Sequence, residues 1–146
     1  MVRKFLEVAK IPRREWVLLL QLILFSLAAA VTLRIVGLPR LVRFIAKCAL
    51  KPWPSRFPLH HDRSEAGRLT ALVELATGIT HGRGRCLARS LALFWLLKAR
   101  GEKPELVIGV SKEACILNSH AWIESHGKIM ADTPDVIGRF ATLLRF

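Results

Sequence analysis

A run of fifteen residues without glycine or proline, Cys86 to Arg100, is the feature that most constrains the fold of this chain. The run is rich in leucine and alanine, and it stops at Gly101, a residue type that commonly ends helices. Gly82 and Gly84 interrupt regular structure just before it. The pattern therefore predicts a helix that begins after a glycine-rich loop and carries Cys86 in its first turn.

Extended segments follow this helix in the sequence. The β-branched run Glu105 to Val110 is typical of a buried strand. Two further segments, Cys115 to Glu124 and Lys128 to Asp132, flank a connection of three residues. The last residue of that connection, Gly127, can take the positive φ that a three-residue hairpin loop needs. A helical amino-terminal region followed by a helix and a small antiparallel sheet predicts an α+β fold.

The register that this loop predicts brings a histidine to an aspartate. If Glu124 pairs with Lys128, His120 lies directly opposite Asp132. Opposed residues of antiparallel strands hold their Cβ atoms roughly 4.5–5.5 Å apart, so the aspartate can accept the imidazole N–H and fix the tautomer. Without a nucleophile nearby, the pair would be an ordinary cross-strand polar contact.

Cys86 can supply that nucleophile. A helix N-terminus presents free backbone N–H groups and the positive end of the helix dipole, which favour thiolate over thiol, and Arg83 and Arg85 add positive charge. A free cysteine is more often a small buried hydrophobe, but such a residue rarely follows a glycine- and arginine-rich loop directly. Cys86, His120 and Asp132 therefore form a predicted catalytic triad of nucleophile, base and orienting residue.

Four sequence motifs around these residues resemble one known family. They are RCL at 85–87, RSLAL at 89–93, LVIGV at 106–110 and HAWIE at 120–124, followed by Gly127. Together they resemble the transglutaminase-like (papain-like) cysteine peptidases of lasso peptide biosynthesis, and the resemblance covers most of the chain. The catalytic cysteine, histidine and aspartate of that family map onto Cys86, His120 and Asp132.

The resemblance implies a function and a set of partners. It implies removal of the leader peptide from a ribosomally made precursor, before a separate ATP-dependent cyclase closes the macrolactam. No winged-helix-like recognition domain is visible, because the residues before the central proline-rich stretch are apolar and basic, not strand-forming. The leader would then be held by a separately encoded leader-binding protein. No cofactor or metal is expected, and the resemblance implies a cytoplasmic location.

Two other functions remain open for the same residues. A transglutaminase-like acyltransferase would pass the Cys86 thioester to an amine instead of water. A non-catalytic binding module tethered to a membrane by residues 16–33 is the second alternative. His81 is a rival base and Asp135 a rival to Asp132, although the predicted register does not bring Asp135 to His120.

The charge distribution and the cysteine content limit the cellular compartment and the partners that this chain is expected to have. Residues 1–56 hold 11 Lys or Arg against 2 acids, a net charge of +9, while residues 57–146 have a net charge of +3. Three cysteines without paired spacing indicate a reducing compartment and argue against a disulfide framework or a structural zinc site. No motif or basic run with stacking aromatic residues accompanies the positive charge, so nucleic acid is not a predicted partner.

The segment Trp16 to Leu33 is uncharged over 18 residues, the short end of a membrane-spanning helix. It could cross or lie on a membrane, serve as a signal peptide, or pack as a helix on the catalytic core or on a partner. Basic residues on both sides weaken the export interpretation. We favour packing, with peripheral membrane contact left open.

The sequence further predicts three regions: an apolar, basic helical region at 1–50, a proline-rich linker at 51–61 and a peptidase core at 62–146. A short amphipathic helix with a basic face is expected over 40–50. A helix after an Asp62 N-cap should bury one face and end at Gly78; that face comprises Leu69, Leu72, Val73 and Ala76. The tail from Asp135 to Phe146 is expected to be helix-like.

Overall fold

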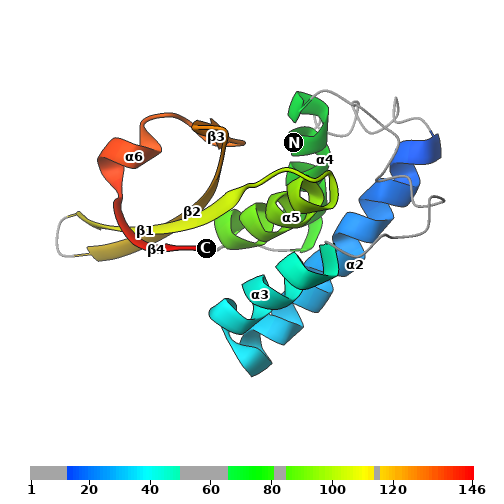
Figure 1. Ribbon diagram of the computed structural model, residues 1–146, viewed down its shortest axis with the longest axis horizontal. Helices are drawn as coiled ribbons and strands as arrows, with labels where there is room; N and C mark the ends of the chain where they lie inside the picture. Colours follow the sequence, from blue (N-terminus) through cyan, green and yellow to red (C-terminus); the bar gives the residue numbers. More distant parts are fainter. Residues whose placement is uncertain (1–12, 50–65, 81–84, 114–115) are drawn as a thin grey trace.

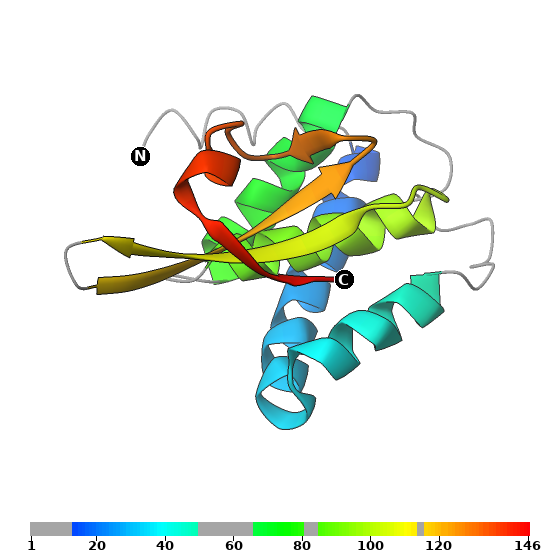
Figure 2. The same ribbon diagram turned by 60° about the vertical axis from the view of Figure 1, so that its left-hand side comes forward.

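A computed structural model describes residues 13–49, 66–80, 85–113 and 116–146. The predicted linker at 51–61, the Asp62 cap and the rival base His81 lie outside the described residues. Within the described part, a four-stranded antiparallel sheet packs on one side of helix α5 (Arg85–Ala99), and three further helices surround the other side of α5 (Figures 1 and 2). The predicted α+β fold is confirmed.

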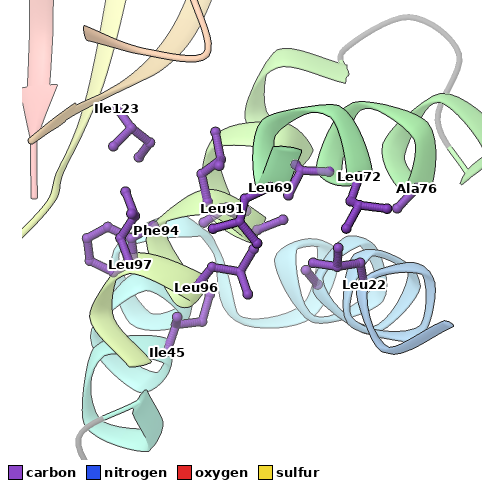
Figure 3. Close-up of a cluster of buried hydrophobic side chains, with 14 of the residues drawn as sticks. Leu22, Ile45, Leu69, Leu72, Ala76, Leu91, Phe94, Leu96, Leu97 and Ile123 are labelled. Atoms are coloured by element: carbon purple, nitrogen blue, oxygen red, sulfur yellow. The ribbon is translucent and has the colours of Figure 1, made fainter. Parts of the chain in front are cut away.

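Helices α4 (Ala66–Thr80) and α5 form the centre of the hydrophobic core. The predicted face of α4 is confirmed, because its four apolar residues are all buried, although the helix continues past Gly78 to Thr80. In α5 the chain leaves the helix at Gly101, whose φ of +80° is a left-handed conformation that glycine adopts without steric cost. Figure 3 shows the resulting cluster, in which side chains of α5 meet those of every neighbouring layer.

Helices α2 (Arg13–Val36) and α3 (Leu38–Ala49) are joined at Gly37, which has a φ of +76°. One face of α2 is buried against α4 and α5: Leu22 is fully buried, and the ring of Phe25 stacks on Trp95 with centroids 4.7 Å apart. Helix α3 buries its own apolar face in the same cluster. The amino-terminal helices therefore share one core with the helix that carries Cys86.

The sheet has the strand order β3-β2-β1-β4. Its strands are β1 (Glu105–Glu113), β2 (Ile116–Ser125), β3 (Lys128–Met130) and β4 (Ala141–Arg145). In the β1–β2 pairing, Gly109 lies opposite His120. The predicted strand at Glu105 to Val110 is confirmed and extends further.

Two predictions about the carboxy-terminal part are wrong. Ser125 pairs with Lys128, so the hairpin loop is the two-residue turn His126-Gly127 and the predicted pairing of Glu124 with Lys128 is off by one residue. Both turn residues have positive φ, 52° and 71°, as a type I′ turn requires. The tail is not simply helix-like: after the one-turn helix α6 (Val136–Arg139), it forms β4 at the sheet edge, paired with β1.

Candidate active site

His120 lies on β2 with its ring close to two aromatic side chains. The ring centroid of Phe140 is 5.2 Å away and that of Trp122 is 6.4 Å away. Trp122 is 1 % exposed and packs against Val107 and Val136, so its main role is to fill the core. The aromatic contacts limit the positions that the His120 ring can take.

Gly109, the cross-strand neighbour of His120, makes this packing possible. A Cβ atom built at Gly109 would lie 2.8 Å from ring carbons of Trp122 and 2.8 Å from the Cβ of Phe140. Such contacts are shorter than van der Waals packing permits, and neither partner is the free end of a flexible chain. The absence of a side chain at Gly109 therefore lets both aromatic residues reach the histidine.

Asp132 contacts His120, although the two residues are not opposed in the sheet. His120 Nε2 lies 2.7 Å from Asp132 Oδ2. Strand β3 ends at Met130, and Ala131 then adopts a φ of +60°, so the chain turns. The predicted position of Asp132, in the strand directly opposite His120, is therefore wrong, and the turn at Ala131 brings the carboxylate to the imidazole instead.

The Asp132 carboxylate accepts two further hydrogen bonds. The Thr133 backbone N–H donates to Oδ1 at 3.0 Å, and Arg89 Nη2 donates to Oδ2 at 2.5 Å. The other terminal nitrogen of Arg89, Nη1, lies 3.7 Å from Glu74 Oε1 on α4. Asp132 is only 13 % exposed, so α5 and the backbone together fix the carboxylate that contacts His120.

Sequence reasoning missed Arg89 and Glu74. Arg89 follows Cys86 by three residues, a helical spacing that places both on one face of α5. Its partner Asp132 is 43 residues away, however, and no local pattern reports such a contact.

Cys86 is the second residue of α5 and is a half-buried free thiol. It shares its helix face with Arg89 and Ser90, three and four residues on. Ser90 Oγ donates to the carbonyl of Ala121, which follows His120 directly, at 2.9 Å. The face that carries Cys86 therefore bonds to both the His120 strand and Asp132, one helical turn beyond the thiol.

The hydrogen bonds define what the imidazole can do. A carboxylate can only accept hydrogen bonds, so Nε2 of a neutral His120 must carry the proton toward Asp132. The lone pair then lies on Nδ1, which makes no hydrogen bond to any residue that the structure describes. Across the same residues, no hydrogen bond joins the Cys86 thiol to the ring. Nδ1 is thus the nitrogen that can take a proton from a thiol or water.

The rival orienting residue, Asp135, has other partners. A hydrogen bond from the Thr133 side chain is the main reason that the pKa of Asp135 lies below its usual range, and Arg139 adds to the effect. Its carboxylate is exposed and lies 3.8 Å from Arg139 Nη1. Asp132, not Asp135, is therefore the carboxylate that contacts His120.

A comparison with protein families agrees with the α+β fold described above. The family model described as the transglutaminase-like superfamily matches residues 24–145, from the middle of α2 to the end of β4. The chain belongs to the transglutaminase-like superfamily. No curated protein and no solved structure matches it. Cysteine peptidases and acyltransferases both occur in the transglutaminase-like superfamily.

A cavity of about 170 Å³ lies elsewhere in this transglutaminase-like chain. It is lined by α2 and by Leu87, Ala88 and Leu91 of α5, which occupy the opposite side of α5 from Cys86 and Arg89. The cavity is therefore separate from the candidate active site. Within the described ranges, no group of three or more metal-binding side chains occurs.

Proposed function

We propose that this protein is a cysteine peptidase that removes the leader peptide from a lasso-type precursor. One observation carries the proposal: the 2.7 Å His120–Asp132 pair is held by Arg89, on the same face of the helix whose first turn carries Cys86. Membership of a superfamily that contains cysteine peptidases supports the reaction class. The four motifs that resemble lasso leader peptidases support the choice of substrate.

The first half of the proposed reaction cleaves the peptide bond. His120 Nδ1 takes the proton of the Cys86 thiol, and the thiolate attacks the scissile carbonyl carbon to form a C–S bond. The resulting imidazolium donates its proton to the leaving nitrogen as the C–N bond breaks. The core peptide departs with a free amine, and the leader remains as a thioester on Cys86.

The second half releases the leader. His120 Nδ1 takes a proton from water as the water oxygen attacks the thioester carbonyl. The C–S bond then breaks, Cys86 recovers a proton and the leader leaves with a new carboxyl group. Through both halves Asp132 holds the Nε2–H side of the ring and stabilises the imidazolium.

The start of α5 can also stabilise the negative oxygen of the intermediate. The first N–H groups of a helix have no partner within the helix, and they lie at the positive end of its dipole. The Cys86 backbone N–H belongs to this turn and is our candidate for one donor of an oxyanion hole.

The proposed partners follow from the same resemblance. They are the precursor peptide, a separately encoded leader-binding protein and an ATP-dependent cyclase that acts on the released core. Acyl transfer to an amine would share the first half-reaction and differ only in the acceptor of the leader.

The test is mass spectrometry of a cognate lasso-type precursor incubated with this protein and its leader-binding partner. We expect release of an intact leader and an intact core. Cys86→Ala should abolish cleavage, whereas Cys48→Ser, a second half-buried free cysteine that lies on α3, should keep the rate within about twofold. Intact precursor after incubation with folded protein would refute leader cleavage, and a leader joined to an amine would move the assignment to acyl transfer.

A further inference from the structure

The face of α2 turned away from the core is a continuous apolar stripe. Seven large apolar side chains on this face are each 47 to 76 % exposed: Trp16, Val17, Leu20, Leu24, Leu27, Val31 and Ile35. At 3.6 residues per turn they fall within about one third of the helix circumference, and at 1.5 Å per residue the stripe is about 28 Å long. Soluble monomers rarely expose an apolar patch of this length, which marks an interaction site. We call it the α2 stripe.

A set of cations accompanies the α2 stripe. The segment 16–49 contains four basic residues and no Asp or Glu, and all four are exposed: Arg34, Arg40, Arg43 and Lys47. The three on α3 share one helix face with the exposed Phe44, opposite the buried face. Figures 1 and 2 show α2 and α3 together on the side of α5 away from the sheet. Apolar and cationic groups therefore belong to one outer layer.

We propose that the α2 stripe and the basic face of α3 bind an anionic lipid membrane, with α2 lying in the interface. The span Trp16–Val36 is long and apolar enough to cross a bilayer, but 28 % of an apolar 18-residue window within it is buried inside the fold. Crossing would require extraction of Leu22 from the core and loss of the stack between Phe25 and Trp95. A helix fixed to the protein on one side can lie along the membrane and insert only its free face.

The chemistry of this surface favours lipid over the other occupants. Protein interfaces combine apolar area with polar groups and hydrogen bonds, whereas none of the seven residues of the α2 stripe is polar. The polar residues between Trp16 and Arg34, which are Gln21, Ser26 and Thr32, are buried or half-buried and lie outside the stripe. A second copy bound through the same stripe would add like charge instead of balancing it, because α2 and α3 together hold six basic residues and one acid, Glu15. Anionic headgroups supply the missing negative charge, and acyl chains match the stripe.

The test is co-sedimentation of the full chain with two kinds of vesicle. One kind contains phosphatidylcholine alone, and the other contains phosphatidylcholine and phosphatidylglycerol at a molar ratio of seven to three. We expect partitioning at least about tenfold stronger to the anionic vesicles, weakening as salt is raised. Each of Arg40→Gln, Arg43→Gln and Lys47→Gln should weaken partitioning about fivefold, since one basic residue near such a surface contributes about 1 kcal/mol.

The apolar part has its own matched pair of variants. Leu24→Gln should weaken partitioning at least about fivefold, because it removes a leucine that would insert. Leu117→Gln, which changes a leucine of β2 that is 72 % exposed, should change partitioning less than twofold. Both positions are exposed, so circular dichroism and thermal unfolding should confirm that each variant folds.

Three results would overturn the proposal. One is no partitioning to anionic vesicles by the folded chain. Another is partitioning that Leu24→Gln and the three α3 variants leave unchanged. The third is a dimer in lipid-free solution that Leu24→Gln dissociates, since this would assign the α2 stripe to a second copy. The assay measures binding alone, so its result is independent of the proposed peptidase activity.

Discussion

Replacement of Arg89 by glutamine should slow catalysis without unfolding the protein. Arg89 does not contact the predicted position of the reacting atoms; it acts through Asp132, whose Oδ2 also contacts His120 Nε2. Glutamine keeps most of the side-chain length but removes the charge and the planar guanidinium. The carboxylate then loses the Arg89 hydrogen bond and keeps those of the Thr133 N–H and His120, so its orientation toward the ring is held less firmly.

The expected fall in kcat/KM follows from the free energy of the hydrogen bond between Arg89 and Asp132 that is lost. Hydrogen bonds to charged groups contribute about 1.5–3 kcal/mol. Arg89 and Asp132 are 20 % and 13 % exposed and Asp132 keeps other donors, so we take the lower half, about 1.5–2 kcal/mol. At about 1.4 kcal/mol per factor of ten, kcat/KM should fall about 10- to 30-fold, mainly through kcat.

The assay is steady-state cleavage of the precursor by variants with verified thermal unfolding. Arg89→Lys keeps the charge but not the fork, so it should recover part of the loss. Glu74→Gln removes a pair that is 3.7 Å long and exposed at Glu74, and it should cost less than about threefold.

A double variant distinguishes positioning from general destabilisation. If Arg89 acts through Asp132, then Arg89→Gln combined with Asp132→Asn should be no slower than Asp132→Asn alone. Rate losses that multiply in the double variant, or an Arg89→Gln enzyme within twofold of wild type, would refute the reasoning.

Three further perturbations test the surroundings of the site. Gly109→Ala should lower stability by about 1–3 kcal/mol, measured by urea unfolding, because the new Cβ meets the Trp122 ring at 2.8 Å. Ala131→Val should cost about 1–2 kcal/mol and slow cleavage, because a β-branched residue resists the φ of +60° that turns Asp132 toward the histidine. Burial alone would raise the pKa of Glu124. Hydrogen bonds from the Trp122 indole and from Arg145, together with the positive charge of Arg145, instead lower this pKa below its ordinary value of 4.5. Glu124→Gln should therefore lose on the order of 1 kcal/mol at neutral pH. Its deficit should shrink as pH falls from 4.5 through the lowered pKa of folded Glu124, because the unfolded chain takes up the proton first and the folded wild type takes it up only at lower pH.

Each of these predictions has a contrary result. Gly109→Ala as stable as wild type would mean that the aromatic rings shift freely. Ala131→Val with unchanged stability would show that the turn is not strained, and Ala131→Gly, which suits positive φ, is the matched control. A Glu124→Gln deficit that is constant from pH 7 to pH 3 would show that the carboxylate charge does not contribute.

Much of the fold could be predicted because its signals are local. Helix α5 is bounded by glycines, the buried face of α4 repeats every three to four residues, and β1 is a β-branched run. β4 could not be predicted in the same way. All five of its residues are exposed, so no alternation of apolar and polar residues marks it. The register also shifts between Ile108 and Gly109, where β4 pairs with β1.

The site was only partly accessible to sequence reasoning. Spacing and resemblance predict the three site residues, but the predicted hairpin register is wrong. A three-residue loop with Gly127 at positive φ is predicted, whereas the turn is His126-Gly127 with the histidine at positive φ as well, which is uncommon for residues other than glycine. The contact of Asp132 with His120 depends on the left-handed conformation of Ala131, which the sequence does not predict. Arg89 and Glu74 join elements far apart in the chain, so only the folded structure brings them together.

The most direct test of the central claim is cleavage of the precursor in water enriched in oxygen-18. Hydrolysis through a Cys86 thioester predicts one heavy oxygen in the new carboxyl group of the leader, and no cleavage by Cys86→Ala. A leader released without heavy oxygen and joined to an amine would contradict hydrolysis. Labelled leader produced by Cys86→Ala would contradict Cys86 as the nucleophile.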